Sequence, residues 1–290
     1  MKTRLPAITS PEFQSAIAGL VKEIAPAAIV CFGYSSSVVS QRSCFYVTSS
    51  EQLHYDLLIV RSYSDGHKEG EVIDLVKKHF AERISLNVLS HSAASVVKAL
   101  REHHPFFCRV FSEGAVVHQS EAFQFDIGDN DECDADRDHT KTARECKRSF
   151  ELSENFLALA SDALGSGTHD VGVFLLHQAM EQLCIASIAA HLQYRPTTHS
   201  TVRLIALVGC YLPQARNLFP RSTSDERELF DYLHKAYSDV RYKVGYRVPA
   251  HIAFSLLERV YEFRHLIEER YKKEFGSGGE AGAEEGFACV

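Results

Sequence analysis

The segment 126–138 restricts most strongly what this chain of 290 residues can fold into, because it separates two parts with different hydrophobic patterns. It carries seven acidic residues against the single basic residue Arg137. Residues 1–125 carry equal numbers of basic and acidic residues, and residues 139–274 are close to neutral. A self-repelling acidic strip between two near-neutral parts is typical of a linker. The pattern predicts two domains, 1–125 and 139–274, joined by residues 126–138.

The remaining composition narrows the class of protein. Residues 275–290 are rich in glycine, alanine and glutamate, and we expect a disordered tail because so little apolar surface cannot pack. No apolar run approaches the ~20 residues of a membrane-spanning helix, and residues 1–6 lack the apolar stretch of a secretory signal. The eight cysteines contain no C-x-x-C pair, which disfavours a zinc ribbon or a disulfide scaffold. These features predict a cytoplasmic protein.

Residues 1–125 contain short apolar runs that alternate with helical patterns. We expect a first helix from Ser10 to Ile24, because serine can cap it and Pro11 suits its first turn. Gly33 and the three serines after Tyr34 are expected to form a turn that follows a buried strand. The other expected strands are 43–49, 53–60, 84–89 and 115–118, after a first strand at 27–32, and the other expected helices are 71–81 and 92–112. The alternation predicts an α/β domain.

Residues 139–274 show no strand patterns. Their apolar residues recur over long stretches with the period of an α-helix. The expected helices are 140–163, 170–192, 200–210, one that begins at Ser224, and 249–273. Short connections between helices of this length predict an antiparallel bundle. The whole chain is therefore expected to be an α+β protein whose second domain is all-α.

The first domain resembles the nucleotidyltransferase family, particularly its minimal branch, at three residues. These are Gly33 and Ser35 after a strand and Asp56 on a later strand. The resemblance implies that they bind a nucleotide such as ATP or GTP. His54 and Asn87 stand where the family has metal-binding carboxylates, and one carboxylate cannot supply the charge that a two-metal site needs. We therefore expect a degenerate domain with neither nucleotidyltransferase activity nor bound Mg²⁺.

Three segments of the second domain resemble the HEPN domain family: 174–181, 194–199 and 236–243. The resemblance implies binding of a nucleotide or single-stranded RNA and a homodimer joined through the helical bundle. In active members of the family, a closely spaced arginine and histidine form a metal-independent ribonuclease motif. Here Arg241 is followed after four residues by Tyr246, and tyrosine is a poor general base at neutral pH. Arg241 and Tyr246 are nevertheless the candidate catalytic residues.

A basic segment rich in tyrosine surrounds Arg241. Cations interleaved with aromatic rings are typical of sites that hold phosphates and stack on bases, so Arg241, Tyr242, Lys243 and Arg247 are predicted to bind the nucleotide. The alternative is a solvated helix end whose tyrosines belong to the core. His177 and Glu181 lie one helical turn apart and are expected to form a structural contact.

The sequence leaves three functions open. The first is a nucleotide- or RNA-binding protein in a regulatory or toxin–antitoxin-like role. The second is a metal-independent ribonuclease that uses Arg241, and the third is a module for dimerisation without catalysis. No metal ion is expected, because histidines such as His104 and His199 have no partners at the spacing of metal ligands.

Overall fold

The computed structural model describes residues 10–42, 44, 47–63, 65–67, 69–80, 84–125 and 139–275. The chain divides into two compact units, residues 1–135 and 136–290. The predicted linker at 126–138 and the tail beyond residue 275 lie outside the described residues. Each unit is described by itself below.

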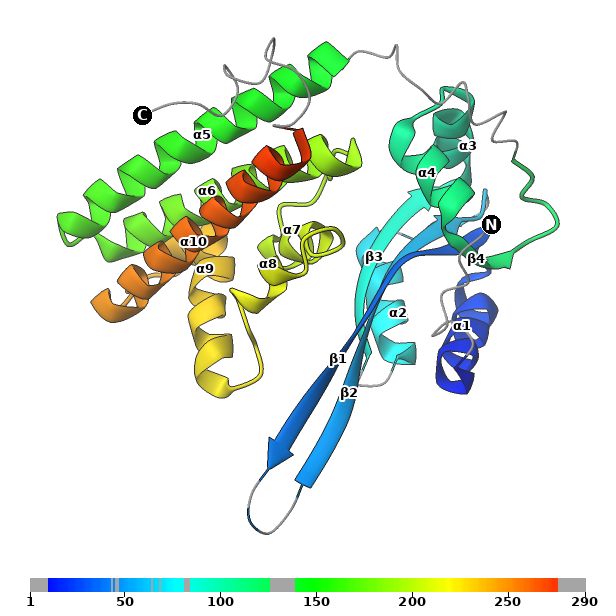
Figure 1. The fold of residues 1–290 in the computed structure, drawn as a ribbon, viewed down its shortest axis with the longest axis horizontal. Coiled ribbons are helices and arrows are strands. Elements are labelled where there is room, and N and C mark those ends of the chain that lie inside the picture. Colours follow the sequence, from blue (N-terminus) through cyan, green and yellow to red (C-terminus); the bar gives the residue numbers. More distant parts are fainter. Residues whose placement is uncertain are drawn as a thin grey trace. The chain divides into compact units, whose positions relative to one another are not determined.

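The N-terminal unit contains a four-stranded mixed sheet in the order β3-β2-β1-β4 (Figure 1). β1 (Ala28–Arg42) pairs antiparallel with both β2 (Val47–Arg61) and β4 (Ala115–Gln119). β2 also pairs in parallel with β3 (Ile84–Ser92). The predicted α/β class of this unit is confirmed, and its sheet is mixed.

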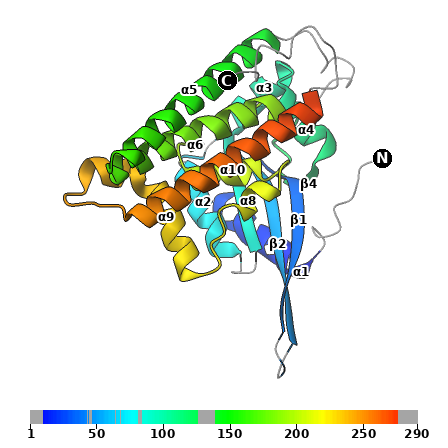
Figure 2. The same cartoon turned by 60° about the vertical axis from the view of Figure 1, so that its left-hand side comes forward.

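β1 and β2 form a longer hairpin than the sequence predicts. The ladder between them runs from Ala28↔Val60 to Arg42↔Val47, and its far end extends beyond the other two strands (Figures 1 and 2). The turn predicted at Gly33 is therefore wrong: Gly33 lies inside β1, next to a break in the register at Phe32. The serines after it carry no hydrophobic signal of their own, and the cross-strand hydrogen bonds with β2 make this segment a strand.

Four helices cover the sheet. α1 (Pro11–Ile24) and α2 (Glu69–His79) pack on one face, where their apolar residues meet alternate residues of β1 and β2 such as Ile29 and Leu57. α3 (Ala93–Arg101) and α4 (Pro105–Glu113) contact β1, β2 and β3. Residues 92–112 were predicted to be one helix, but the chain breaks at His103, which has a φ of 52°. Pro105 explains the break, because proline disfavours helical geometry in the residue before it and suits the first turn of a new helix.

The described residues of the C-terminal unit form helices and the loops between them, with no strand (Figure 1). Its long helices are α5 (His139–Gly165), α6 (His169–Leu192), α9 (Ser224–Tyr242) and α10 (Ala250–Phe275), with the short α7 (Thr201–Val208) and α8 (Gln214–Asn217) between α6 and α9. α6 contacts α5, α7, α9 and α10 and is the central helix of the bundle. The five predicted helices are confirmed, and the unit also contains α8, which is four residues long and was not predicted.

Among the described residues, one helix is long and apolar enough to cross a membrane, and this helix is α6. The apolar window of α6 is 67% buried inside the protein. Burial by neighbouring helices is what a core helix of a bundle requires, so its hydropathy is explained by its central place.

Candidate functional site

The predicted nucleotide-binding residues of the N-terminal unit lie together on neighbouring strands. Asp56 on β2 pairs in register with Gly33 on β1 and with Asn87 on β3, and His54 pairs with Ser35. His54 Nε2 lies 3.0 Å from Asp56 Oδ1, and both side chains are buried. Asp56, the carboxylate on which the resemblance to nucleotidyltransferases rests, therefore already has a partner.

Gly33 has a different role from the one predicted. A Cβ atom at this position would lie 2.3 Å from Asp56 Oδ2, so glycine is what allows the carboxylate of Asp56 to approach the backbone of β1. A strand whose backbone is paired with its neighbour does not offer the run of free N–H groups that a phosphate-binding turn supplies.

The predicted residues of the C-terminal unit lie at the end of α9 and in the loop after it. Arg241 is exposed, and its Nε donates a hydrogen bond of 2.6 Å to the carbonyl oxygen of Tyr237. The guanidinium carbon lies 3.9 Å from the centre of the Tyr237 ring and 5.0 Å from that of Tyr242. The two terminal nitrogens of Arg241 make no hydrogen bond or ion pair with any described residue. The rings therefore hold the cation while leaving its terminal donors for a ligand.

The neighbouring cations are paired only weakly. Lys243 Nζ lies 3.8 Å from an oxygen of Asp239, and Arg247 Nη1 lies 3.5 Å from an oxygen of Asp170. All of these contacts are at the surface, where such pairs contribute little to stability. A phosphate can therefore replace the carboxylate partner of either cation with little loss of stability.

Tyr246, the residue in the position of the family's histidine, is poorly suited to take a proton. Its hydroxyl oxygen is buried and has no hydrogen-bond partner in the described part of the chain. Burial is the main cause that raises the pKa of Tyr246 to about 12, and the carboxylate of Asp239 raises it further. The phenol therefore stays protonated at neutral pH, and its function as a base remains a prediction without support from its surroundings.

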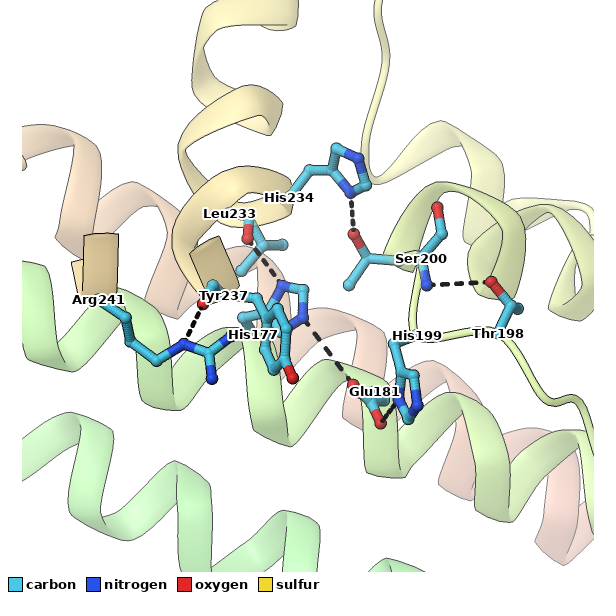
Figure 3. A network of polar contacts seen from close by, with 10 residues as sticks. His177, Glu181, Thr198, His199, Ser200, Leu233, His234, Tyr237 and Arg241 are labelled. Carbon is cyan, nitrogen blue, oxygen red and sulfur yellow. Dashed lines mark hydrogen bonds and ion pairs between the residues drawn. The ribbon is translucent and has the colours of Figure 1, made fainter. Parts of the chain in front are cut away.

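A row of polar contacts connects Arg241 with the interior of the bundle (Figure 3). The Tyr237 ring stacks on the imidazole of His177 with centres 5.7 Å apart. The Nδ1 of His177 donates to the carbonyl oxygen of Leu233 at 3.0 Å, and its Nε2 lies 3.9 Å from Glu181 Oε2. Burial is the main cause that lowers the pKa of His177, so this imidazole is neutral at neutral pH.

The row ends at a histidine to which the sequence assigns no metal-binding role, because it has no partners at the spacing of metal ligands. His199, in the loop between α6 and α7, places its Nδ1 2.9 Å from Glu181 Oε1. This contact joins two residues that are 18 positions apart, so no helical spacing signals it. The segment 194–199, which carries the family resemblance, was the only sequence signal near it. Among the described residues, no group of three or more histidine, cysteine or acidic side chains is placed to hold a metal ion.

Comparison with known proteins finds a family model that matches most of the helical unit. Residues 146–270 match the sequence model of the HEPN domain. A solved structure of a nucleotidyltransferase-like protein from Exiguobacterium sibiricum is 10% identical, with a TM-score of 0.32 over 91% of this chain and 76% of that chain. No curated protein matches the chain. The bundle that presents Arg241, Tyr237 and His199 thus matches the HEPN domain over residues 146–270.

Proposed function

We propose that this protein binds a nucleotide or single-stranded RNA through the end of α9 and the loop after it. The observation that carries the proposal is the position of Arg241 against the rings of Tyr237 and Tyr242. Tyr242 is 76% exposed, which suits a ring that stacks on a base. Lys243 and Arg247 add positive charge within a few residues, and their weak pairing at the surface supports a phosphate-binding role.

The biological setting is a further part of the proposal. A HEPN domain that binds RNA, next to a nucleotidyltransferase-like domain whose carboxylate is already paired, is consistent with a cytoplasmic regulatory or toxin–antitoxin-like role without nucleotidyl transfer. We also propose a homodimer joined through the helical unit. Exposed apolar side chains support it, because Leu152 and Leu159 on α5 and Phe254 and Tyr261 on α10 recur seven residues apart, and α5 contacts α10.

Binding of a fluorescent single-stranded RNA and of ATP and GTP to the full chain tests the proposed function. Affinity should fall steeply with salt, because neutralised phosphates release counterions. Arg241→Ala should weaken binding by about 1–3 kcal/mol if the guanidinium makes charge-assisted hydrogen bonds to phosphate. Tyr242→Leu should weaken binding with little change in the salt dependence, because it removes stacking and no charge.

Arg148→Ala is the matched control, since Arg148 is an exposed arginine on α5 of the same unit. It should leave both the affinity and the melting temperature unchanged. If Arg241→Ala lowers the melting temperature and leaves the affinity intact, Arg241 is a scaffold residue and the proposed site is wrong.

A further inference from the structure

The basic segment, residues 241–247, also presents an apolar side chain that the proposed nucleotide does not use. The segment contains three basic residues and no acidic one. Val244 follows directly after two of these cations and is fully exposed, and the nearby ring of Tyr242 is 76% exposed. A phosphate or a base gives the cations and the ring a partner, but Val244 offers it neither a charge nor a hydrogen bond. The surface therefore fits a protein ligand that is acidic and also carries an apolar side chain.

The chain itself contains such a ligand after its last helix. Residues 276–290, called the tail below, include three acidic residues, no basic residue and the aromatic Phe287. Carboxylates form charge-assisted hydrogen bonds with arginine and lysine, and an aromatic ring packs on another ring or on an aliphatic side chain. The acidic segment 126–138 has no aromatic residue. The tail therefore complements the basic segment both in charge and in apolar character.

The length of α10 decides which copy of the chain supplies the tail. The basic segment precedes this helix and the tail follows it, and the helix has 26 residues, or a length of ~39 Å. The ten residues from Gly276 to Glu285 span at most ~36 Å when fully extended. A glycine-rich chain of that length spans only ~17 Å on average. The acidic residues of the tail therefore do not readily reach the basic segment of their own chain.

A second copy of the chain brings the tail much closer. In the proposed homodimer, a two-fold axis that crosses α10 between the exposed Phe254 and Tyr261 makes the two copies of α10 run antiparallel. The second copy of α10 then extends past Ala250 by ~15 Å, alongside the loop that contains the basic segment. This distance is within the average span of the tail.

We propose that the basic segment binds the tail of a second copy of this chain. The cations contact the tail carboxylates, and Tyr242 and Val244 pack against Phe287. The present partners of the cations are easily exchanged, because Lys243 lies 3.8 Å from an Asp239 oxygen and Arg247 lies 3.5 Å from an Asp170 oxygen at the surface. The inference rests on the proposed homodimer and shares its surface with the proposed nucleotide site. The tail therefore competes with a nucleotide or RNA.

The first experiment measures the contact without any nucleotide. A fluorescent peptide with the sequence of residues 276–290 is added to the full chain that carries Glu280→Gln, Glu284→Gln and Glu285→Gln, so that its own tail competes less. The peptide should bind, and a peptide with the same three replacements should bind about 10-fold more weakly. In the receptor, Lys243→Gln should weaken binding of the acidic peptide, with an unchanged melting temperature. Arg148→Ala is the matched control and should bind the peptide unchanged.

The second experiment identifies the copy that supplies the tail. Val244→Cys introduces a thiol into the basic segment of the full chain, and Cys289 supplies one in the tail. Cys44→Ser in all variants removes an exposed thiol. A short bis-maleimide should then join two chains into a covalent dimer, and Cys289→Ser should abolish this product. Arg148→Cys in place of Val244→Cys is the control and should give no product that depends on Cys289. A link within one chain would show that the assignment to a second copy is wrong.

The outcomes separate this inference from the proposed function. If the peptide does not bind, or if Arg148→Ala weakens it as much as Lys243→Gln, the tail contact is wrong and nucleotide binding stands. If the peptide binds and neither RNA nor ATP nor GTP does, the tail contact stands and the proposed function is wrong. If both bind, the three glutamine replacements should raise the affinity of the full chain for RNA several-fold. An unchanged RNA affinity would contradict a shared surface.

Discussion

Gly33 illustrates at the scale of a single residue why a motif can be recognised correctly and interpreted wrongly. The sequence showed a glycine after an apolar run, and glycine is common in turns. The structure shows instead that Asp56 occupies the space that a side chain at this position would need. The contact depends on the register between β1 and β2, which the local sequence does not contain.

Gly33→Ala should therefore destabilise the N-terminal unit by about 1–3 kcal/mol, because the new methyl group displaces the Asp56 carboxylate. Gly70→Ala in α2 is the control, since a Cβ atom there meets nothing within 4 Å. That change should be neutral or stabilising by up to about 1 kcal/mol in a helix. Urea unfolding followed by circular dichroism measures both, and equal stabilities would contradict the assigned role of Gly33.

The buried imidazole of His177 predicts a pH dependence of stability. Burial lowers its pKa in the folded protein, so the unfolded chain binds this proton more readily. Its contribution is complete above the unfolded pKa of about 6.5 and is lost as the pH falls below that value. His177→Asn keeps a donor for Leu233 and removes the titration. Its melting temperature should fall less between about pH 7 and pH 5 than that of the parent protein. If the melting temperatures of the two proteins fall by the same amount, His177 does not contribute to the pH dependence of stability.

The candidate site was predictable where its residues are neighbours in sequence and not where folding brings them together. Arg241 and Tyr242 are adjacent, and the structure places their side chains in contact as a cation against a ring. The contact of His199 with Glu181 requires the chain to turn back after α6 and place the loop against that helix. Packing of that kind leaves no periodic signal in the sequence.

At the scale of elements, the helices of the C-terminal unit were predicted within a few residues because each has a long apolar stripe. α9 begins at Ser224, as predicted, and the residue that caps it is Thr223. Thr223 accepts a hydrogen bond from the backbone of Glu226, whose carboxylate accepts one from the backbone of Thr223. The separate strands predicted at 43–49 and 53–60 are one long β2 in the described residues, because pairing along β1 continues through the polar residues between them.

Removing this cap tests how much it contributes to α9. Thr223→Ala should cost about 1 kcal/mol of stability, because the backbone N–H of Glu226 loses its side-chain acceptor. Ser224→Ala is the control, since the Ser224 hydroxyl donates only to its neighbour Asp225. Thermal unfolding should show a lower midpoint for the first variant alone. Similar midpoints for the two variants would show that other contacts fix the end of α9.

The contact of Asp56 on β2 leads to a prediction about nucleotidyl transfer. Asp56 is held by His54, and the matching residue on β3 is the neutral Asn87. We expect no Mg²⁺-dependent transfer of nucleotide from labelled ATP or GTP to RNA or protein. Label transfer that disappears in Asp56→Ala would contradict this expectation and would show that the N-terminal unit is catalytic.

At the scale of the whole molecule, the proposed homodimer predicts a measurable mass. Light scattering on the full chain should give twice the 32.5 kDa of one chain. Leu159→Glu should reduce the dimer, because Leu159 is 54% exposed on α5 and a charge there is not compensated in an apolar interface. Arg148→Ala on the same helix should leave the mass unchanged. A monomer for the parent protein would contradict the proposed assembly.

The central place of α6 also has a consequence for the synthesis of the protein. α9 and α10, which cover this apolar helix, are translated after it, and at ordinary elongation rates α10 follows on the order of ten seconds later. Until α10 is complete, the face of α6 that α10 contacts has no partner in the nascent chain. A message truncated before the codon for residue 250 therefore yields a polypeptide that aggregates or is bound by chaperones.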